Sequence, residues 1–151
     1  MLSLPRELEV NDATPPRALS IDQILIGDTI VQNVVFDDEA NLAFLCLARD
    51  RAPVHEDDQF ARGQGFEGRI IQGLAVISRF SRLLGMYLPG ERAVLEKVEF
   101  KFHHPVYAGR ELIYTCAVKR IVRALRVVSL EVSVDCDAVR RVSGQCQCLI
   151  L

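Results

Sequence analysis

A carboxylate and a histidine lie close together in a charged stretch of the sequence, Ala48 to Asp58, which reads ARDRAPVHEDD. Asp50 and His55, the latter one of only three histidines in the chain, carry groups that can take up and release protons. Pro53 stands between them with a fixed φ, so both side chains can point at one water molecule if the loop bends. The pair is therefore a candidate for acid–base chemistry.

Gly73 supplies a third candidate group, because it opens an apolar segment with the pattern of a buried helix. The first N–H groups of a helix have no partner within it and point at whatever lies in front. The Gly73 amide can therefore donate a hydrogen bond to an oxygen that gains negative charge. Taken singly, Asp50, His55 and Gly73 would be interpreted as a surface carboxylate, a loop histidine and a turn glycine.

The composition of the chain is that of an ordinary soluble globular protein. Half of its 151 residues are hydrophobic, a quarter are charged, and the formal net charge is −2. This length suits one domain that buries a core without disulfides or metals, and no basic excess indicates a nucleic-acid partner. Because the N-terminus carries charges and no apolar run is long enough for a membrane helix, we expect a cytoplasmic protein with no membrane partner.

The cysteines do not predict a metal site or a disulfide framework. The chain has five, an odd set without a CxxC pair, and the histidines do not complete a zinc spacing. We therefore expect reduced thiols, no metal and no cofactor. Four cysteines fall on the predicted inward face of strands and are interpreted as small buried hydrophobes. They are Cys116, Cys136, Cys146 and Cys148.

The elements that must position the candidate groups follow from hydrophobic periodicity. Residues 1–18 contain two consecutive prolines and little periodicity, which predicts a flexible arm outside the core. Residues 19–151 are predicted to form a single domain. Its first strand, rich in β-branched residues, covers 29–36.

A helix follows that strand and leads into the charged stretch. Asp37 or Asp38 can cap this helix, which should end before Pro53. The charged stretch is predicted as a loop, and a glycine-rich connection, GQGFEGRIIQG, returns the chain to the apolar helix. Pro89 and Gly90 close that helix, which is apolar around most of its circumference and should be covered by protein.

The remainder of the chain alternates between apolar and polar residues in four runs. They cover residues 97–102, 112–118, 128–136 and 142–150. Alternation predicts strands with one buried face, and the short turns between them are typical of an antiparallel meander. An apolar helix therefore faces a long antiparallel sheet, which is an α+β arrangement.

This order of elements is that of a hot-dog domain, in which a long antiparallel β-sheet wraps around a central apolar helix. The segment RDRAPVHEDDQFARGQGFEGRIIQG resembles the signature of the MaoC-like dehydratases and (R)-specific enoyl-CoA hydratases. The matching positions, with the family's spacing, are Asp50, Pro53, Val54, His55, Ala61, Gly65, Phe66 and Gly73. The resemblance extends from IGDTI to FKFHHPVYAGREL, residues 20–121.

The resemblance implies reversible hydration of trans-2-enoyl thioesters, linked to coenzyme A or to a carrier protein, to (R)-3-hydroxyacyl thioesters. In this reaction Asp50 is the expected base, His55 its partner in activating water, and the Gly73 amide the donor to the thioester oxygen. The residues expected at the substrate are Val54, Phe66, Gln72 and Arg51. The family also implies a homodimer or an oligomer of dimers, which would cover an edge strand and apolar surface.

Three positions depart from the family pattern. Arg49 stands where the family usually has glycine, Ala52 where it has asparagine, and Gln72 where it often has histidine. Gln72 either assists the oxyanion donor or shapes the turn. Loss of the asparagine removes a side chain that can bond the loop backbone, and Arg49 puts bulk and charge beside the site. Two alternatives therefore stay open: an acyl-thioester hydrolase, and a non-catalytic acyl-thioester-binding protein.

Two further pairs of residues are interpreted as less informative. His103 and His104 are neighbours on a predicted strand, so they should point to opposite faces as structural or surface groups. Arg79 and Arg82 lie one helical turn apart and form a solvated or dimer-facing stripe, or bind a coenzyme A phosphate.

Overall fold

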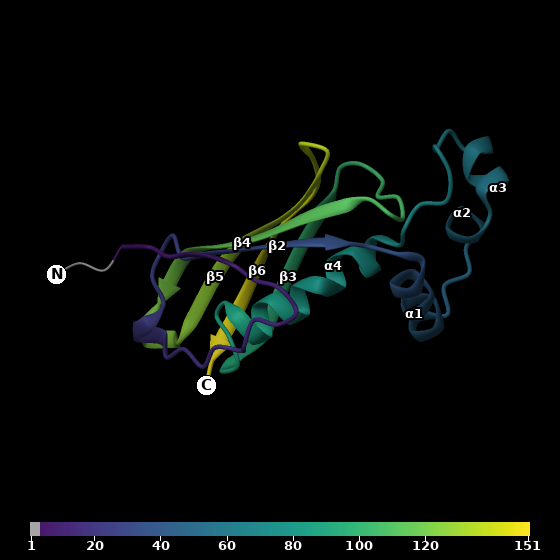
Figure 1. The fold of residues 1–151 in the computed structure, drawn as a ribbon. Coiled ribbons are helices and arrows are strands. Elements are labelled where there is room, and N and C mark those ends of the chain that lie inside the picture. The colour runs from purple at the N-terminus through teal and green to yellow at the C-terminus, as the bar shows by residue number, and fades with distance from the viewer. Residues whose placement is uncertain (1–3) are drawn as a thin grey trace.

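The protein, described for residues 4–151 by a computed structural model, is built around one six-stranded sheet with a helix against one face (Figure 1). The strands are β1 (Glu7–Glu9), β2 (Thr29–Val35), β3 (Ala93–Phe102), β4 (Glu111–Val122), β5 (Val127–Cys136) and β6 (Val139–Ile150). Their order in the sheet is β1-β2-β4-β5-β6-β3. All neighbours pair antiparallel except β1, which runs parallel to β2. This confirms the α+β hot-dog architecture.

The central helix α4 (Gly73–Arg82) packs its apolar side against the sheet. Phe80 stacks on Phe100 with ring centroids 5.5 Å apart and meets the edge of Tyr114 at 5.4 Å. The buried Tyr114 hydroxyl donates to the Val76 carbonyl at 2.9 Å, which ties the sheet to the helix backbone. The predicted helix continues past Arg82 as a short π-helical segment, η2 (Leu83–Tyr87).

The four cysteines predicted on the inward face are buried, which confirms their interpretation as small hydrophobes. Burial raises the pKa of Cys146 to about 11 and, together with the charge of a Cys146 thiolate, that of Cys148 to about 12. Both thiols therefore stay protonated at neutral pH and are poor nucleophiles.

Strand β3 differs from the other long strands because it forms an edge of the sheet. Its alternation correctly predicted a strand, but Val98 and Phe102 are 48% and 49% exposed rather than buried. The reason is topological, since β3 pairs only with β6 among the described strands and leaves its other side open.

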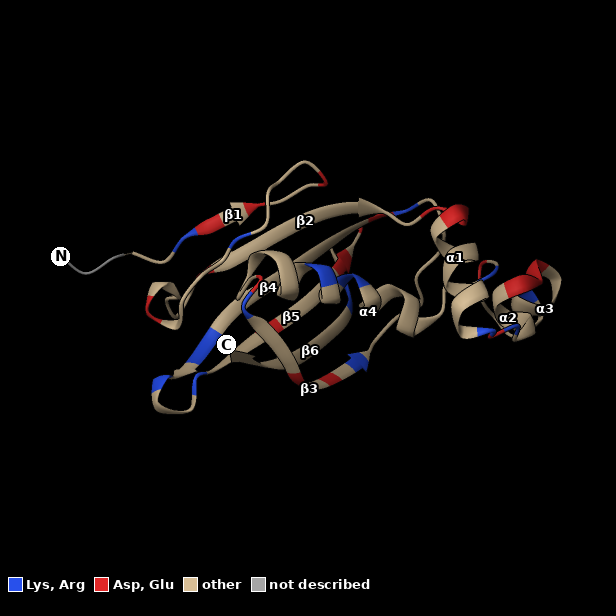
Figure 2. Ribbon diagram, turned by 90° about the horizontal axis from the view of Figure 1, so that it is seen from below, with Lys and Arg blue, Asp and Glu red and all other residues tan. Residues whose placement is uncertain are grey.

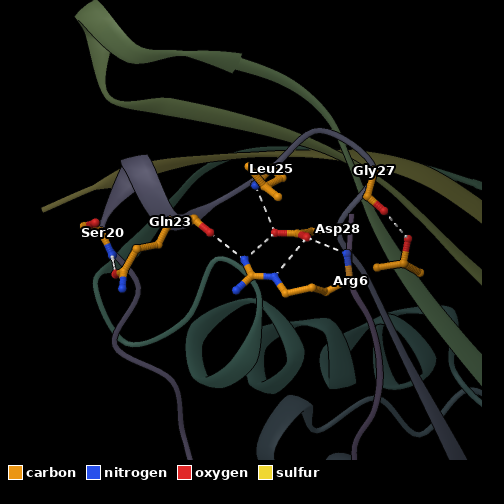
Figure 3. A network of polar contacts seen from close by, with 7 residues as sticks. Arg6, Ser20, Gln23, Leu25, Gly27 and Asp28 are labelled. Carbon is orange, nitrogen blue, oxygen red and sulfur yellow. Dashed lines mark hydrogen bonds and ion pairs between the residues drawn. The ribbon is translucent and has the colours of Figure 1, made fainter. Parts of the chain in front are cut away.

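The N-terminal segment does not follow the expectation of an arm outside the core. Leu8 pairs with Ile30 in the β1–β2 ladder, and Val10 is 2% exposed within the core. Figure 3 shows why the segment is held: Arg6 bonds to the buried carboxylate of Asp28 through its backbone and its guanidinium. Pairing with β2, burial of Val10 and the Arg6–Asp28 ion pair thus hold this segment on the sheet, although its hydrophobic periodicity is weak.

Three helices form a lobe at one end of the sheet, where acidic and basic residues are numerous (Figures 1 and 2). They are α1 (Asp38–Ala48), α2 (Pro53–Glu56) and α3 (Asp58–Gly63). The Asp37 side chain caps α1 by accepting from the Ala40 amide at 2.9 Å. The charged stretch predicted as a loop contains α2 and the first residue of α3, because Pro53 suits a first helical turn and Asp57 caps α3. No helix in the described part of the chain is long and apolar enough to cross a membrane.

Candidate active site

The turn between α1 and α2 positions Asp50. Arg49 ends α1 in the left-handed region, with φ at 55°, and its N–H donates to the Leu45 carbonyl at 2.8 Å. A left-handed C-terminal position favours glycine, which explains the residue usual there in the family. The Asp50 Oδ1 then accepts from the Ala52 amide at 3.1 Å, so the carboxylate itself closes the turn.

His55 faces Asp50 from α2. Its Nδ1 lies 2.7 Å from the Ile70 carbonyl oxygen, and its Nε2 lies 3.7 Å from the Asp50 Oδ2. Because a carbonyl can only accept, Nδ1 carries a proton, and Nε2 of the neutral ring presents a lone pair toward Asp50. The imidazole is 13% exposed, whereas the Asp50 side chain is 44% exposed. His55 is thus held in place and largely buried, whereas the Asp50 carboxylate is open to solvent.

Gly73 begins α4 beside this pair. A Cβ atom at Gly73 would lie 2.8 Å from the Phe102 ring, so any larger residue would have to displace that ring. The preceding residue, Gln72, takes the N-cap position without a capping hydrogen bond, which leaves the first N–H groups of α4 to a ligand. Its Nε2 donates instead to the Asp50 carbonyl, at a long 3.5 Å, and its Oε1 is buried without a protein partner.

A cavity of about 420 Å³ lies beside these groups. His55, Phe66 and Gly73 line it together, and Asp50 adjoins it through His55. The rest of its lining is apolar apart from two further histidines, His103 and His104. An apolar chamber with an acid–base pair and a helix N-terminus can hold an acyl group and polarise a carbonyl beside it.

The other predicted substrate residues do not line the cavity. Val54 lies half-buried and accepts from the Ile70 amide at 3.1 Å, and Gln72 lies buried beside the pair. Arg51 is exposed and pairs with Glu56 at 3.3 Å. Val54 and Gln72 thus bond to the backbone around the Asp50–His55 pair and lie outside the lining of this cavity.

His103 and His104 are lining residues that sequence reasoning set aside. The expectation that they face opposite sides fails because β3 ends at Phe102, so strand alternation does not extend to them. The available signal was that they precede the Pro105 of the family-like turn.

The two arginines of α4 have separate surroundings. Arg82 pairs with Asp12 at 3.3 Å and donates to the Tyr87 hydroxyl at 3.0 Å, so it fastens the N-terminal segment to the end of the helix. Arg79 lines a groove between β2 and α1, outside the cavity that contains His55. Among residues 4–151, no three histidine, cysteine or acidic side chains are placed to hold a metal ion.

The chain is similar to known proteins over part of its length. A 3-hydroxyacyl-[acyl-carrier-protein] dehydratase, mitochondrial, of Arabidopsis thaliana is 35% identical over 88 residues, 58% of this chain and 52% of that protein. The (R)-specific enoyl-CoA hydratase of Aeromonas caviae is 39% identical over 70 residues, 46% of this chain and 52% of that one. In these alignments the chain spans about half the length of the curated relatives it matches.

Solved structures match over more of the chain. The (R)-hydratase from A. caviae superposes with a TM-score of 0.80 at 26% identity, covering 85% of this chain and 98% of that one. The R-hydratase PhaJ1 from Pseudomonas aeruginosa, at 20% identity and a TM-score of 0.78, covers 86% of this chain and 84% of its own and shares the fold. The family model of the MaoC-like domain matches residues 17–139. The chain therefore belongs to the MaoC-like domain family.

Proposed function

We propose that this protein is a hydro-lyase that adds water reversibly to trans-2-enoyl thioesters and gives (R)-3-hydroxyacyl thioesters. The observation that carries the proposal is the 3.7 Å approach of His55 Nε2 and Asp50 Oδ2 beside the free N-terminus of α4. Relatives named as an enoyl-CoA hydratase and an acyl-carrier-protein dehydratase support it.

The geometry of the pair suits a water molecule. Both facing atoms, Asp50 Oδ2 and His55 Nε2, are hydrogen-bond acceptors, so one water can donate a proton to each of them. Its oxygen lone pairs then point away from the pair, toward a substrate in the cavity. Asp50 takes one proton as the water oxygen bonds to C3 of the enoyl group, and His55 holds the remaining hydroxyl.

The electrons displaced from the double bond reach the thioester oxygen, where the Gly73 N–H stabilises the charge. The proton held by Asp50 then returns to C2, so that the elements of water are added and the carboxylate is restored. Phe66 and the apolar wall of the cavity exclude bulk water from the acyl group.

The substrate carrier is coenzyme A or an acyl carrier protein, and we propose that the protein acts as a homodimer. The open edge of β3 supports this, because two copies can pair their edges and cover Val98 and Phe102. Light scattering should give the mass of two chains, and Val98→Lys should shift it toward one. The cytoplasmic location stays a prediction.

One assay separates hydration from thioester hydrolysis and from binding alone. Crotonyl-CoA and longer trans-2-enoyl-CoAs are offered while enoyl absorbance and free thiol are both followed. We expect absorbance to fall without thiol release, and Asp50→Asn or His55→Ala to abolish the change. Asp38→Asn, the same change at an exposed carboxylate of α1, is the matched control and should keep the activity. Thiol release would indicate a hydrolase, and no signal with any thioester would refute catalysis.

A further inference from the structure

All three histidines of this chain line the same cavity. His55 enters from α2, whereas His103 and His104 enter from the segment after β3. The other lining residues are apolar or glycine, so the cavity wall, which lies entirely in the described part of the chain, includes no carboxylate. His55 faces Asp50, whereas the other two imidazoles, those of His103 and His104, can donate to an anion, although the chain as a whole has a net charge of −2.

Hydrogen bonds to and from Arg141 hold the backbone around His103 and His104 in place. Both of their amides donate to the Arg141 carbonyl, at 2.8 and 3.4 Å, and the Arg141 guanidinium donates to the Pro105 carbonyl at 3.3 Å. The His103 Nε2 lies 2.7 Å from the Ser143 hydroxyl, which fixes that ring. The His104 side chain makes no hydrogen bond to a described residue. One imidazole is thus oriented and the other is free to meet a ligand.

The histidines stand at the exposed side of a cavity whose far wall is buried. Val76, Val106 and Val142 are nearly inaccessible to solvent, whereas His103 and His104 are exposed. The Phe102 ring lies beside Gly73, the candidate oxyanion donor, and the two exposed histidines follow Phe102 in the chain. The cavity therefore fits a ligand with an apolar end inside and an anionic end at the surface.

We propose that His103 and His104 bind the phosphate of the phosphopantetheine arm that carries the acyl group. The inference rests on the proposed function, which places the thioester at the Gly73 amide; His103 and His104 are exposed residues that line the same cavity as Gly73. Imidazole N–H groups donate to phosphate oxygens, and the protonated rings add charge. Coenzyme A and acyl carrier proteins share this arm, so the pair would recognise either carrier.

The test uses binding of saturated thioesters, which cannot be hydrated, so that it does not depend on catalysis. Calorimetry compares butyryl-CoA, butyryl-4′-phosphopantetheine and butyryl-pantetheine on the unchanged protein and on the double variant His103→Gln/His104→Gln. We expect the double variant to bind both phosphorylated thioesters about tenfold more weakly and butyryl-pantetheine equally well. A butyryl-loaded acyl carrier protein, if it binds, should weaken likewise. Arg120→Gln removes an exposed charge outside the cavity and is the matched control.

Two results would overturn the proposal. An equal loss for all three thioesters would show that the histidines only support the fold, and a loss for butyryl-CoA alone would assign them to the nucleotide phosphates. Thermal melting of the double variant shows whether it is folded, and the single variant His104→Gln, which breaks no internal side-chain bond, repeats the comparison if it is not. Failure of crotonyl-CoA hydration with an intact binding difference would refute the proposed reaction and leave the phosphate site standing.

Discussion

Asp28 and Asp50 are both carboxylates in turns, Asp28 before β2 and Asp50 after α1. The Asp28 side chain is buried and fully hydrogen-bonded, whereas the Asp50 side chain is exposed. Asp28 is 4% exposed and accepts from the Arg6 amide at 2.9 Å, from the Arg6 guanidinium at 2.8 Å, and from the Leu25 amide at 2.9 Å (Figure 3). Asp50 is 44% exposed, accepts one backbone bond, and leaves Oδ2 facing a histidine at 3.7 Å.

The difference shows how a fold separates a carboxylate that is fully bonded from one that stays accessible to a ligand. Burial alone would raise the pKa of Asp28, but the hydrogen bonds from Arg6 and Leu25 and the Arg6 charge outweigh it, so the pKa is lowered. A carboxylate in that state holds the chain together and cannot act as a base. Asp50 keeps an acceptor free at a side chain that is open to solvent, so a water molecule can bind there without a buried unpaired oxygen.

Neutralising Asp50 should give the largest effect. Asp50→Asn should lower kcat for crotonyl-CoA hydration on the order of 1,000-fold, because the amide cannot accept the proton of water. The free energy of unfolding should change by less than about 0.5 kcal/mol, since the side chain is 44% exposed and the asparagine oxygen can still accept from the Ala52 amide. Steady-state kinetics and urea unfolding measure the two quantities, and a large loss of stability would make Asp50 structural.

The converse variant, Asp28→Asn, should lower the free energy of unfolding by about 2 kcal/mol, because hydrogen bonds to a charged group are lost. The kcat of the folded variant should stay within about twofold of the parent, since Asp28 lies outside the cavity that lines the site. A variant that unfolds normally but has lost hydration would contradict the assignment of Asp28 to the scaffold.

Acid should remove the difference between the parent and Asp28→Asn. The folded pKa of Asp28 lies below its ordinary value of about 4, so the ion pair contributes fully above that pH. As pH falls through the folded pKa, Asp28 takes up a proton and the contribution is lost. Urea unfolding at pH 7 and then at steps below pH 4 should show the two stabilities converging, whereas a constant gap would exclude an ionised Asp28.

Ala52→Asn should give the smallest effect, a gain of about 1 kcal/mol in unfolding free energy. Ala52 occupies the N-cap of α2 without a capping bond, and asparagine can accept from the amides of the next turn. Thermal melting measures the gain, and Ala124→Asn, at an exposed turn between β4 and β5, is the comparison for a change of side chain alone. No gain would mean that Asp50, through its bond to the Ala52 amide, already supplies the cap.

The sheet and its central helix could be predicted because period-two alternation and an apolar run directly encode burial. Position within the sheet could not, since the same alternation occurs in the exposed edge strand β3 and the covered strand β5. The N-terminal segment was missed because its hold on the sheet depends on a partner far away in sequence, the Asp28 that binds Arg6.

The part of the candidate site that comes from one segment of the sequence could be predicted. Asp50, His55 and Gly73 follow a local pattern, and the structure brings them together. His103 and His104 come from another part of the chain, and their orientation depends on where β3 stops, which no local pattern states. Their placement in the cavity is a property of the tertiary fold.

Ile70 joins the two sides of the catalytic segment, since its amide donates to the Val54 carbonyl and its carbonyl accepts from His55. Everything between His55 and Ile70, including α3, is therefore a loop closed at its base by two hydrogen bonds. The entropy of closing such a loop changes slowly with its length. Residues 57–65, which precede the cavity-lining Phe66, can therefore vary in length or sequence while the two bonds of Ile70 still hold Val54 and His55 in place, which makes this segment a natural place for diversification.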